Sequence, residues 1–142
     1  MPALPIFERF TASDYGLFPG SEDAPGIQID FEPGLTLILG ANGLGKTTLV
    51  TMLYRLCTGP SDIPSLASAG DLGGRRQDVR PLNRPSQRLF AARVGDEAKT
   101  ATASLLMVIG GRRIAVTRSL QTLKLTALES DGDSLETSEE VF

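Results

Sequence analysis

The chain has 142 residues, of which 41% are hydrophobic and 22% charged, so it can form one globular domain with a hydrophobic core. Its single cysteine, Cys57, excludes an intrachain disulfide, and the lack of histidine argues against a zinc cluster. No apolar run approaches the ~18 residues of a membrane span, and the N-terminus lacks a secretory-signal pattern. We therefore expect a cytoplasmic protein with no membrane partner.

The net charge of −3 is unevenly distributed along the chain. All 14 basic residues precede position 129, whereas six of the 17 acidic residues follow position 128. Residues 1–128 therefore carry +3, from 14 basic and 11 acidic residues, and the remaining stretch carries −6. A weakly basic body permits contact with a polyanion without requiring it.

Two strands are predicted near the N-terminus, at 6–12 and 27–31, where polar and apolar residues alternate. The residues between them, 13–26, are rich in glycine and proline and predict a long, turn-rich connection. Asp30 and Glu32 end the second alternating stretch, and we interpret them as solvent-facing residues rather than as a catalytic acid.

The next segment contains the strongest motif of the chain. Residues 35–39 are a short apolar run that predicts a buried strand, and residues 40–47 fit the P-loop pattern G-x-x-x-x-G-K-[ST]. Apolar residues at helical spacing then predict a helix over 48–56, ended by Gly59 and Pro60. Strand, glycine loop and helix stand in the order that a phosphate-binding loop requires, which argues against a chance match.

The residue types of this loop suit a nucleoside triphosphate. Its glycines let successive backbone N–H groups point at an anion, and the helix that follows adds its positive dipole end. We expect Lys46 to contact the β- and γ-phosphates and to neutralise charge during catalysis, and the Thr47 hydroxyl to coordinate Mg²⁺. Thr48 is expected to donate to another phosphate oxygen.

Residues 59–86 are rich in proline and glycine and predict an irregular insertion. Within it, 71–77 is superficially similar to the signature sequence of ABC-type ATPases, but it lacks the serine and the following glutamine, so we interpret the similarity as fortuitous. Arg75 and Arg76 belong to the densest basic stretch, for which two interpretations stay open; the stretch also includes Arg80, Arg84, Arg88 and Arg93. One is a solvated loop, and the other is contact with nucleotide or DNA phosphates.

The second half of the chain predicts β structure. Four strand-like runs occur, at 88–94, 101–109, 112–120 and 121–128, and the Gly110-Gly111 pair predicts a tight hairpin. The last stretch, 129–142, predicts an acidic turn and then, from a T-x-x-E capping box, the start of a helix. We expect the chain to continue beyond this helix start.

These motifs together resemble one family. The segment G-A-N-G-L-G-K-T-T-L is similar to the Walker A segment of ABC-type ATPases, and the stretches 54–59 and 111–120 resemble the N-terminal half of the head of SMC-like, double-strand-break-repair ATPases. The resemblance implies an α/β P-loop fold: a β-rich ABC/SMC-type N-terminal lobe over residues 1–142, with the P-loop helix packed on the sheet and a coiled coil downstream. The implied nucleotide-binding residues are Gly40, Asn42, Gly43, Gly45, Lys46, Thr47 and Thr48.

The resemblance also implies a mechanism. Two heads would enclose two ATP molecules with Mg²⁺, and ATP binding and hydrolysis would drive a clamp on DNA in repair or genome defence, together with a nuclease or effector subunit. The Walker B acid and the signature motif are expected downstream, so this segment alone is expected to be inactive. Two other functions stay open: an ABC transporter-type ATPase subunit, and a nucleotide-responsive interaction module that does not hydrolyse ATP.

Overall fold

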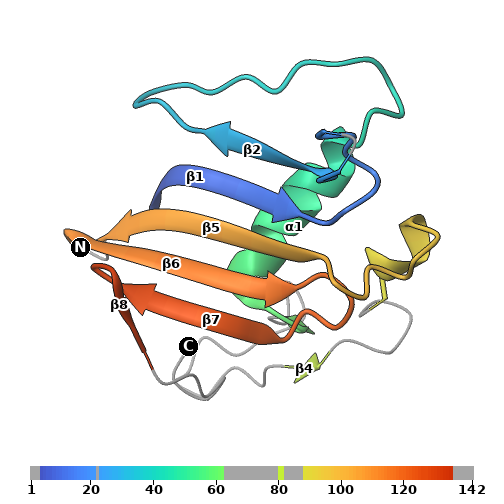
Figure 1. Cartoon of the computed structure of the whole chain (residues 1–142). Coiled ribbons are helices and arrows are strands. Elements are labelled where there is room, and N and C mark those ends of the chain that lie inside the picture. Colours follow the sequence, from blue (N-terminus) through green and yellow to red (C-terminus); the bar gives the residue numbers. More distant parts are fainter. Residues whose placement is uncertain (1–3, 22, 63–79, 82–87, 136–142) are drawn as a thin grey trace, which may run out of the picture.

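The structure, a computed structural model, describes residues 4–21, 23–62, 80–81 and 88–135. Its main layer is an antiparallel sheet with the strand order β2-β1-β5-β6-β7-β8, and the helix α1 crosses one face of that sheet (Figure 1). The bounds are β1 Ile6–Ser13, β2 Gly26–Asp30, α1 Lys46–Thr58, β5 Thr102–Ile109, β6 Arg112–Ser119, β7 Leu125–Ser130 and β8 Asp133–Ser134.

The core lies between α1 and the sheet. Along β5, every second residue (Ala103, Leu105 and Met107) is buried, because successive side chains of a strand point to opposite faces. From α1, Leu49, Met52 and Leu56 meet this face at helical spacing. The hydrophobic spacing in the sequence thus determines which side of each element is buried.

Several predicted elements are confirmed. The strands expected at 6–12, 27–31, 101–109 and 112–120 correspond to β1, β2, β5 and β6, and the helix expected at 48–56 lies within α1. Gly110 and Gly111 form the β5–β6 turn with φ angles of 58° and 82°. Gly59 ends α1 with a φ of 64°.

The strand predicted at 35–39 is wrong. These residues are irregular, and Leu35 and Leu39 are 86% and 84% exposed. A strand forms only when its backbone groups pair with a neighbour, and no strand in the described part of the chain pairs with this run. The connection from β2 to α1 therefore loops outward from the sheet edge (Figure 1).

The strand predicted at 88–94 is also wrong, because this segment forms a turn and the short 3₁₀ helix η2 (Ala91–Arg93). Phe90 and Ala91 are both buried, and two consecutive buried residues do not fit a strand with one wet face.

The strand predicted at 121–128 is displaced along the chain, since β7 begins at Leu125 and ends at Ser130. The Ser119 hydroxyl accepts from the backbone N–H of Gln121, and Leu123 has a φ of 63°. A turn therefore precedes the strand.

The predicted insertion at 59–86 is described only in part. Its described residues include β3 (Ser61–Asp62) and β4 (Arg80–Pro81), which pair with each other in a short antiparallel ladder rather than remaining irregular. Arg75, Arg76 and the helix start expected near position 137 lie outside the described residues. Within the described ranges, no helix has the length and apolar character needed to cross a membrane.

Candidate nucleotide-binding site

The glycine loop and the start of α1 form the candidate site. Gly43 and Gly45 have φ angles of 89° and 84°, a region that side chains other than glycine rarely adopt, so the loop requires glycine at both positions. Asn42 is exposed in this loop. Because α1 begins at Lys46 without a side-chain N-cap or an acidic residue in its first turn, its first N–H groups keep their capacity for an anion.

Lys46 folds back over the loop. Its Nζ donates to the carbonyl oxygen of Gly40 and, at 2.7 Å, to that of Ala41. The ammonium group therefore lies at the loop, where the predicted phosphates would bind. An ammonium group, glycine amides and a helix N-terminus together are the donor set that a triphosphate needs, so the residues present fit a nucleotide.

The two threonines after Lys46 have different surroundings. Thr47 is exposed and can supply one hydroxyl oxygen to Mg²⁺, whose other ligands would come from phosphate and water. Thr48 is only 2% exposed, and its hydroxyl accepts a hydrogen bond from Arg93 Nη1 at 2.8 Å. The structure thus brings Arg93 to the predicted phosphate-binding residue Thr48, a contact that the sequence did not reveal.

Side chains from the connection after β1 pack against the glycine loop. A Cβ atom placed on Gly45 would lie 3.1 Å from Phe18 Cε1 and 3.4 Å from Leu17 Cδ2, so the backbone at Gly45 rests directly on these side chains. The rings of Phe18 and Tyr15 contact each other with centroids 5.8 Å apart. Buried side chains therefore help to set the position of the loop.

Tyr15 contacts both Phe18, beside the glycine loop, and the segment that carries Arg93. Its hydroxyl donates to the carbonyl oxygen of Phe90 at 3.0 Å, and both residues are fully buried. Burial raises the pKa of Tyr15, and the nearby charge of Arg93 partly opposes that rise. Sequence reasoning missed Tyr15 and Phe18 and placed Arg93 only within a basic stretch, because partners 27 to 75 residues apart leave no local pattern.

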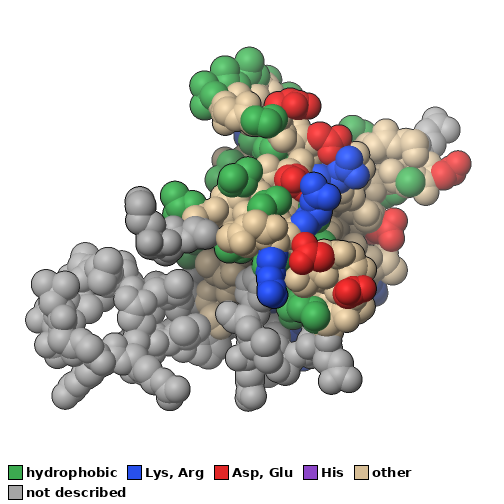
Figure 2. Space-filling model, turned by 90° about the vertical axis from the view of Figure 1, so that its left-hand side faces the viewer, with side chains coloured by type: hydrophobic (Ala, Val, Ile, Leu, Met, Phe, Trp, Pro, Cys, Tyr) green, Lys and Arg blue, Asp and Glu red, His purple; other side chains and the backbone are tan. Residues whose placement is uncertain are grey.

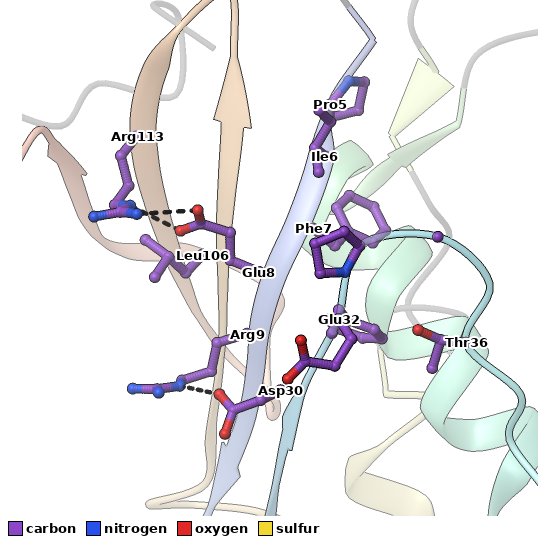
Figure 3. Close-up of a pocket in the computed structure, with 13 residues that line it drawn as sticks. Pro5, Ile6, Phe7, Glu8, Arg9, Asp30, Glu32, Thr36, Leu106 and Arg113 are labelled. Carbon is purple, nitrogen blue, oxygen red and sulfur yellow. Dashed lines mark hydrogen bonds and ion pairs between the residues drawn. The ribbon is translucent and has the colours of Figure 1, made fainter.

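Among the open grooves of the described residues, two bear on the candidate site. One of about 550 Å³ lies beside the loop and is mainly apolar, with Leu44, Lys46 and Ile29 among its lining residues. A larger one of about 1000 Å³ lies away from the loop, where the Glu8–Arg113 and Arg9–Asp30 pairs cross the sheet (Figure 3).

The second groove is the less suited to a phosphate, because its charged groups already neutralise one another. Figure 2 shows basic and acidic side chains alternating on this side of the molecule. Asp30 is exposed, and its hydrogen bond from Arg9 lowers its pKa. Glu32 is also exposed, so the prediction that both acids face solvent is confirmed.

Comparison with known proteins identifies the class. A family model described as an AAA domain matches residues 20–136, and the chain belongs to this family of SMC-like P-loop ATPases. RecF, the DNA replication and repair protein, from two strains of Desulfitobacterium hafniense is 50% identical over 34 residues. The matched segment spans 24% of this chain and 9% of each RecF protein. No solved structure matches the chain.

Proposed function

We propose that this chain is the ATP-binding part of an SMC-like ATPase head that couples ATP binding and hydrolysis to DNA clamping in DNA repair. The observation that carries the proposal is the position of Lys46. It is the first residue of α1, and its ammonium group donates hydrogen bonds to carbonyl oxygens of the glycine loop. The match to the family and the short similarity to RecF support a repair ATPase.

The roles of the loop residues follow from their chemistry. The amides of Gly43, Gly45 and Lys46 bind phosphate oxygens, and the Lys46 ammonium stabilises negative charge on the β- and γ-phosphates. Thr47 contributes an oxygen ligand for Mg²⁺, which supplies further charge neutralisation when it is bound. These groups bind and orient the triphosphate, while the carboxylate that activates water belongs to another part of the head or to a partner.

The exposed apolar run at 35–39 supports the proposal that another part of the ATPase head packs against this lobe. Leu35, Leu37 and Leu39 are 86%, 69% and 84% exposed, and Val50 and Tyr54 of α1 are about half exposed. Contiguous exposed apolar residues mark contact surfaces in soluble proteins. In the proposed head, the downstream half of the ATPase covers this surface and pairs with residues 35–39.

Thermal unfolding with and without Mg-ATP tests nucleotide binding. A ligand at 100 times its Kd stabilises the folded state by about 2.7 kcal/mol, so a clear rise in melting temperature is expected. Lys46→Ala should abolish the rise, whereas Lys124→Ala, which removes an exposed lysine far along the chain, should retain it. Equal melting of the wild type with and without Mg-ATP would contradict a nucleotide site.

Phosphate release by the full-length protein separates the remaining functions. The proposal expects ATP hydrolysis that DNA stimulates and that Lys46→Ala abolishes. Binding without any phosphate release would favour the non-hydrolysing, nucleotide-responsive module. Hydrolysis that is indifferent to DNA, in a protein without a long heptad segment after residue 142, would favour the transporter-type subunit.

The arginine pair of the insertion is proposed to contact DNA phosphates. Replacing Arg75 and Arg76 by alanine should weaken DNA binding by the full-length protein and reduce the dependence of affinity on salt, because fewer counterions are then displaced. The matched control replaces Arg112 and Lys124 by alanine, which removes the same charge elsewhere. Unchanged affinity of the Arg75/Arg76 variant at low salt would exclude the role.

A further inference from the structure

The hydroxyl of Thr48 is used differently from those of the other α1 threonines that form hydrogen bonds. Threonine in a helix commonly donates to the carbonyl oxygen four residues earlier. Thr51 does so to Thr47 at 2.7 Å, and Thr58 to Tyr54 at 3.1 Å. The Thr48 hydroxyl instead accepts a hydrogen bond from Arg93 Nη1 at 2.8 Å.

This contact leaves the Thr48 proton available. A guanidinium group only donates, so the threonine oxygen must be the acceptor, and its own proton stays free for another partner. Within the described residues, no hydrogen bond uses this proton, although Thr48 is only 2% exposed. A buried donor without an acceptor costs about 1–3 kcal/mol, so the arrangement is suited to an acceptor that arrives with a ligand.

The position of Arg93 points to the same kind of ligand. Thr48 lies in the first turn of α1, where the helix dipole is positive and a cation is unfavourable. Neither an acidic residue in this turn nor a side-chain N-cap offsets the added charge. An anion bound at the start of α1 would interact favourably with both the helix and the guanidinium group.

Buried residues, rather than a flexible surface, hold Arg93 in place. Its backbone N–H donates to the carbonyl oxygen of Phe90 at 3.1 Å, and the Tyr15 hydroxyl donates to that same oxygen at 3.0 Å. Phe90 is fully buried in the core. The backbone that carries Arg93 is therefore fixed relative to the sheet and to Tyr15, whose ring contacts Phe18 beside the glycine loop.

We propose that Arg93 is a positioning residue of the nucleotide site. By donating a hydrogen bond to the Thr48 hydroxyl oxygen, Arg93 orients that hydroxyl so that the Thr48 proton is donated to a phosphate oxygen. This inference rests on the proposed function, because it requires a nucleotide at the loop.

Titration calorimetry with ADP on the full-length protein tests the inference. Arg93→Met and Thr48→Val keep most of the side-chain volume while removing the hydrogen bond, and each should weaken ADP binding about tenfold, or about 1.4 kcal/mol. Because both act through one contact, the double variant should also lose about tenfold rather than a hundredfold. Arg88→Met is the matched control, since it breaks only the exposed pair with Glu97 and should leave ADP affinity unchanged.

The outcomes separate the two proposals. Wild-type affinity in Arg93→Met would overturn the positioning role, even if its melting temperature without nucleotide fell, because the arginine would then be structural only. Losses that multiply in the double variant would also overturn it, since Arg93 would then act independently of Thr48. If neither the wild type nor the Arg88→Met control bound ADP, the nucleotide site itself would be refuted.

Discussion

Arg118 donates through Nε to the carbonyl oxygen of Leu56 at 3.1 Å, at the C-terminal end of α1. In a continuing helix this oxygen would accept from the N–H four residues later, but that residue is Pro60, which has none. Arg118 also donates from Nη1 to the carbonyl oxygen of Leu123 at 3.2 Å, and Arg118 is only 4% exposed. A buried strand residue thus replaces a hydrogen bond that the helix end cannot make.

We predict that Arg118→Met destabilises the fold by about 2–4 kcal/mol, because two buried carbonyl groups lose a charged donor. Urea unfolding measures the effect as a lower midpoint. Arg112→Met, at the exposed start of the same strand, is the matched control and should change the midpoint little. Equal midpoints for the two variants would show that the Arg118 contacts do not stabilise the native state.

Replacement by alanine should destabilise the fold more at the loop glycine Gly45 than at Gly111, although the two residues have nearly the same φ angle. Gly45 and Gly111 have φ angles of 84° and 82°, but an added Cβ would meet Phe18 at 3.1 Å at Gly45 and nothing within 4 Å at Gly111. We predict a cost of about 1–2 kcal/mol for Gly111→Ala, from the left-handed backbone, and a larger cost for Gly45→Ala. Thermal unfolding without nucleotide gives the comparison. Equal losses would mean that Phe18 and Leu17 yield freely and do not support the loop.

The bidentate pair of Arg113 with Glu8, at 2.7 and 3.0 Å, connects β6 to β1 across the intervening strand β5. The Glu8 carboxylate raises the pKa of Arg113. Because the Arg113 side chain is 61% exposed, solvent weakens the attraction, and we predict only a small fall in melting temperature for Arg113→Gln.

Two comparisons test whether this effect is electrostatic. The fall in melting temperature should shrink as salt is added, since ions screen exposed charges. Glu8→Gln should have the same effect as Arg113→Gln, and the double variant no further effect. A loss that is independent of salt would indicate that the side chains act through packing.

Burial raises the pKa of the Cys57 thiol, although Arg118 opposes the rise. The thiolate is the reactive form, so the native protein should react with iodoacetamide more slowly than the urea-unfolded chain at the same pH. A group whose folded pKa lies above its unfolded value stabilises the fold fully below the unfolded pKa, and this contribution is lost as pH rises through the folded value. Stability should therefore decline above pH 9.0, and less so in Cys57→Ala. Faster reaction in the native state would contradict the shift.

The sequence by itself determined the elements whose signals are local. Alternating residues predicted β1, β2, β5 and β6, and the glycine pattern predicted the loop that holds Lys46 at the start of α1. Glycine conformations, helix spacing and strand alternation are properties of neighbouring residues, so they can be read before the chain folds.

Only the tertiary structure decided the features that depend on distant partners. The run at 35–39 has the composition of a strand but no neighbouring strand among the described residues, so its leucines remain exposed. The segment at 88–94 looked like a strand, yet it forms a turn and η2, in which the adjacent residues Phe90 and Ala91 are both buried. The contacts of Arg93 with Thr48 and of Arg118 with Leu56 join residues 45 and 62 positions apart. Such pairs arise only when α1 packs on the sheet, because packing rather than local propensity brings these groups together.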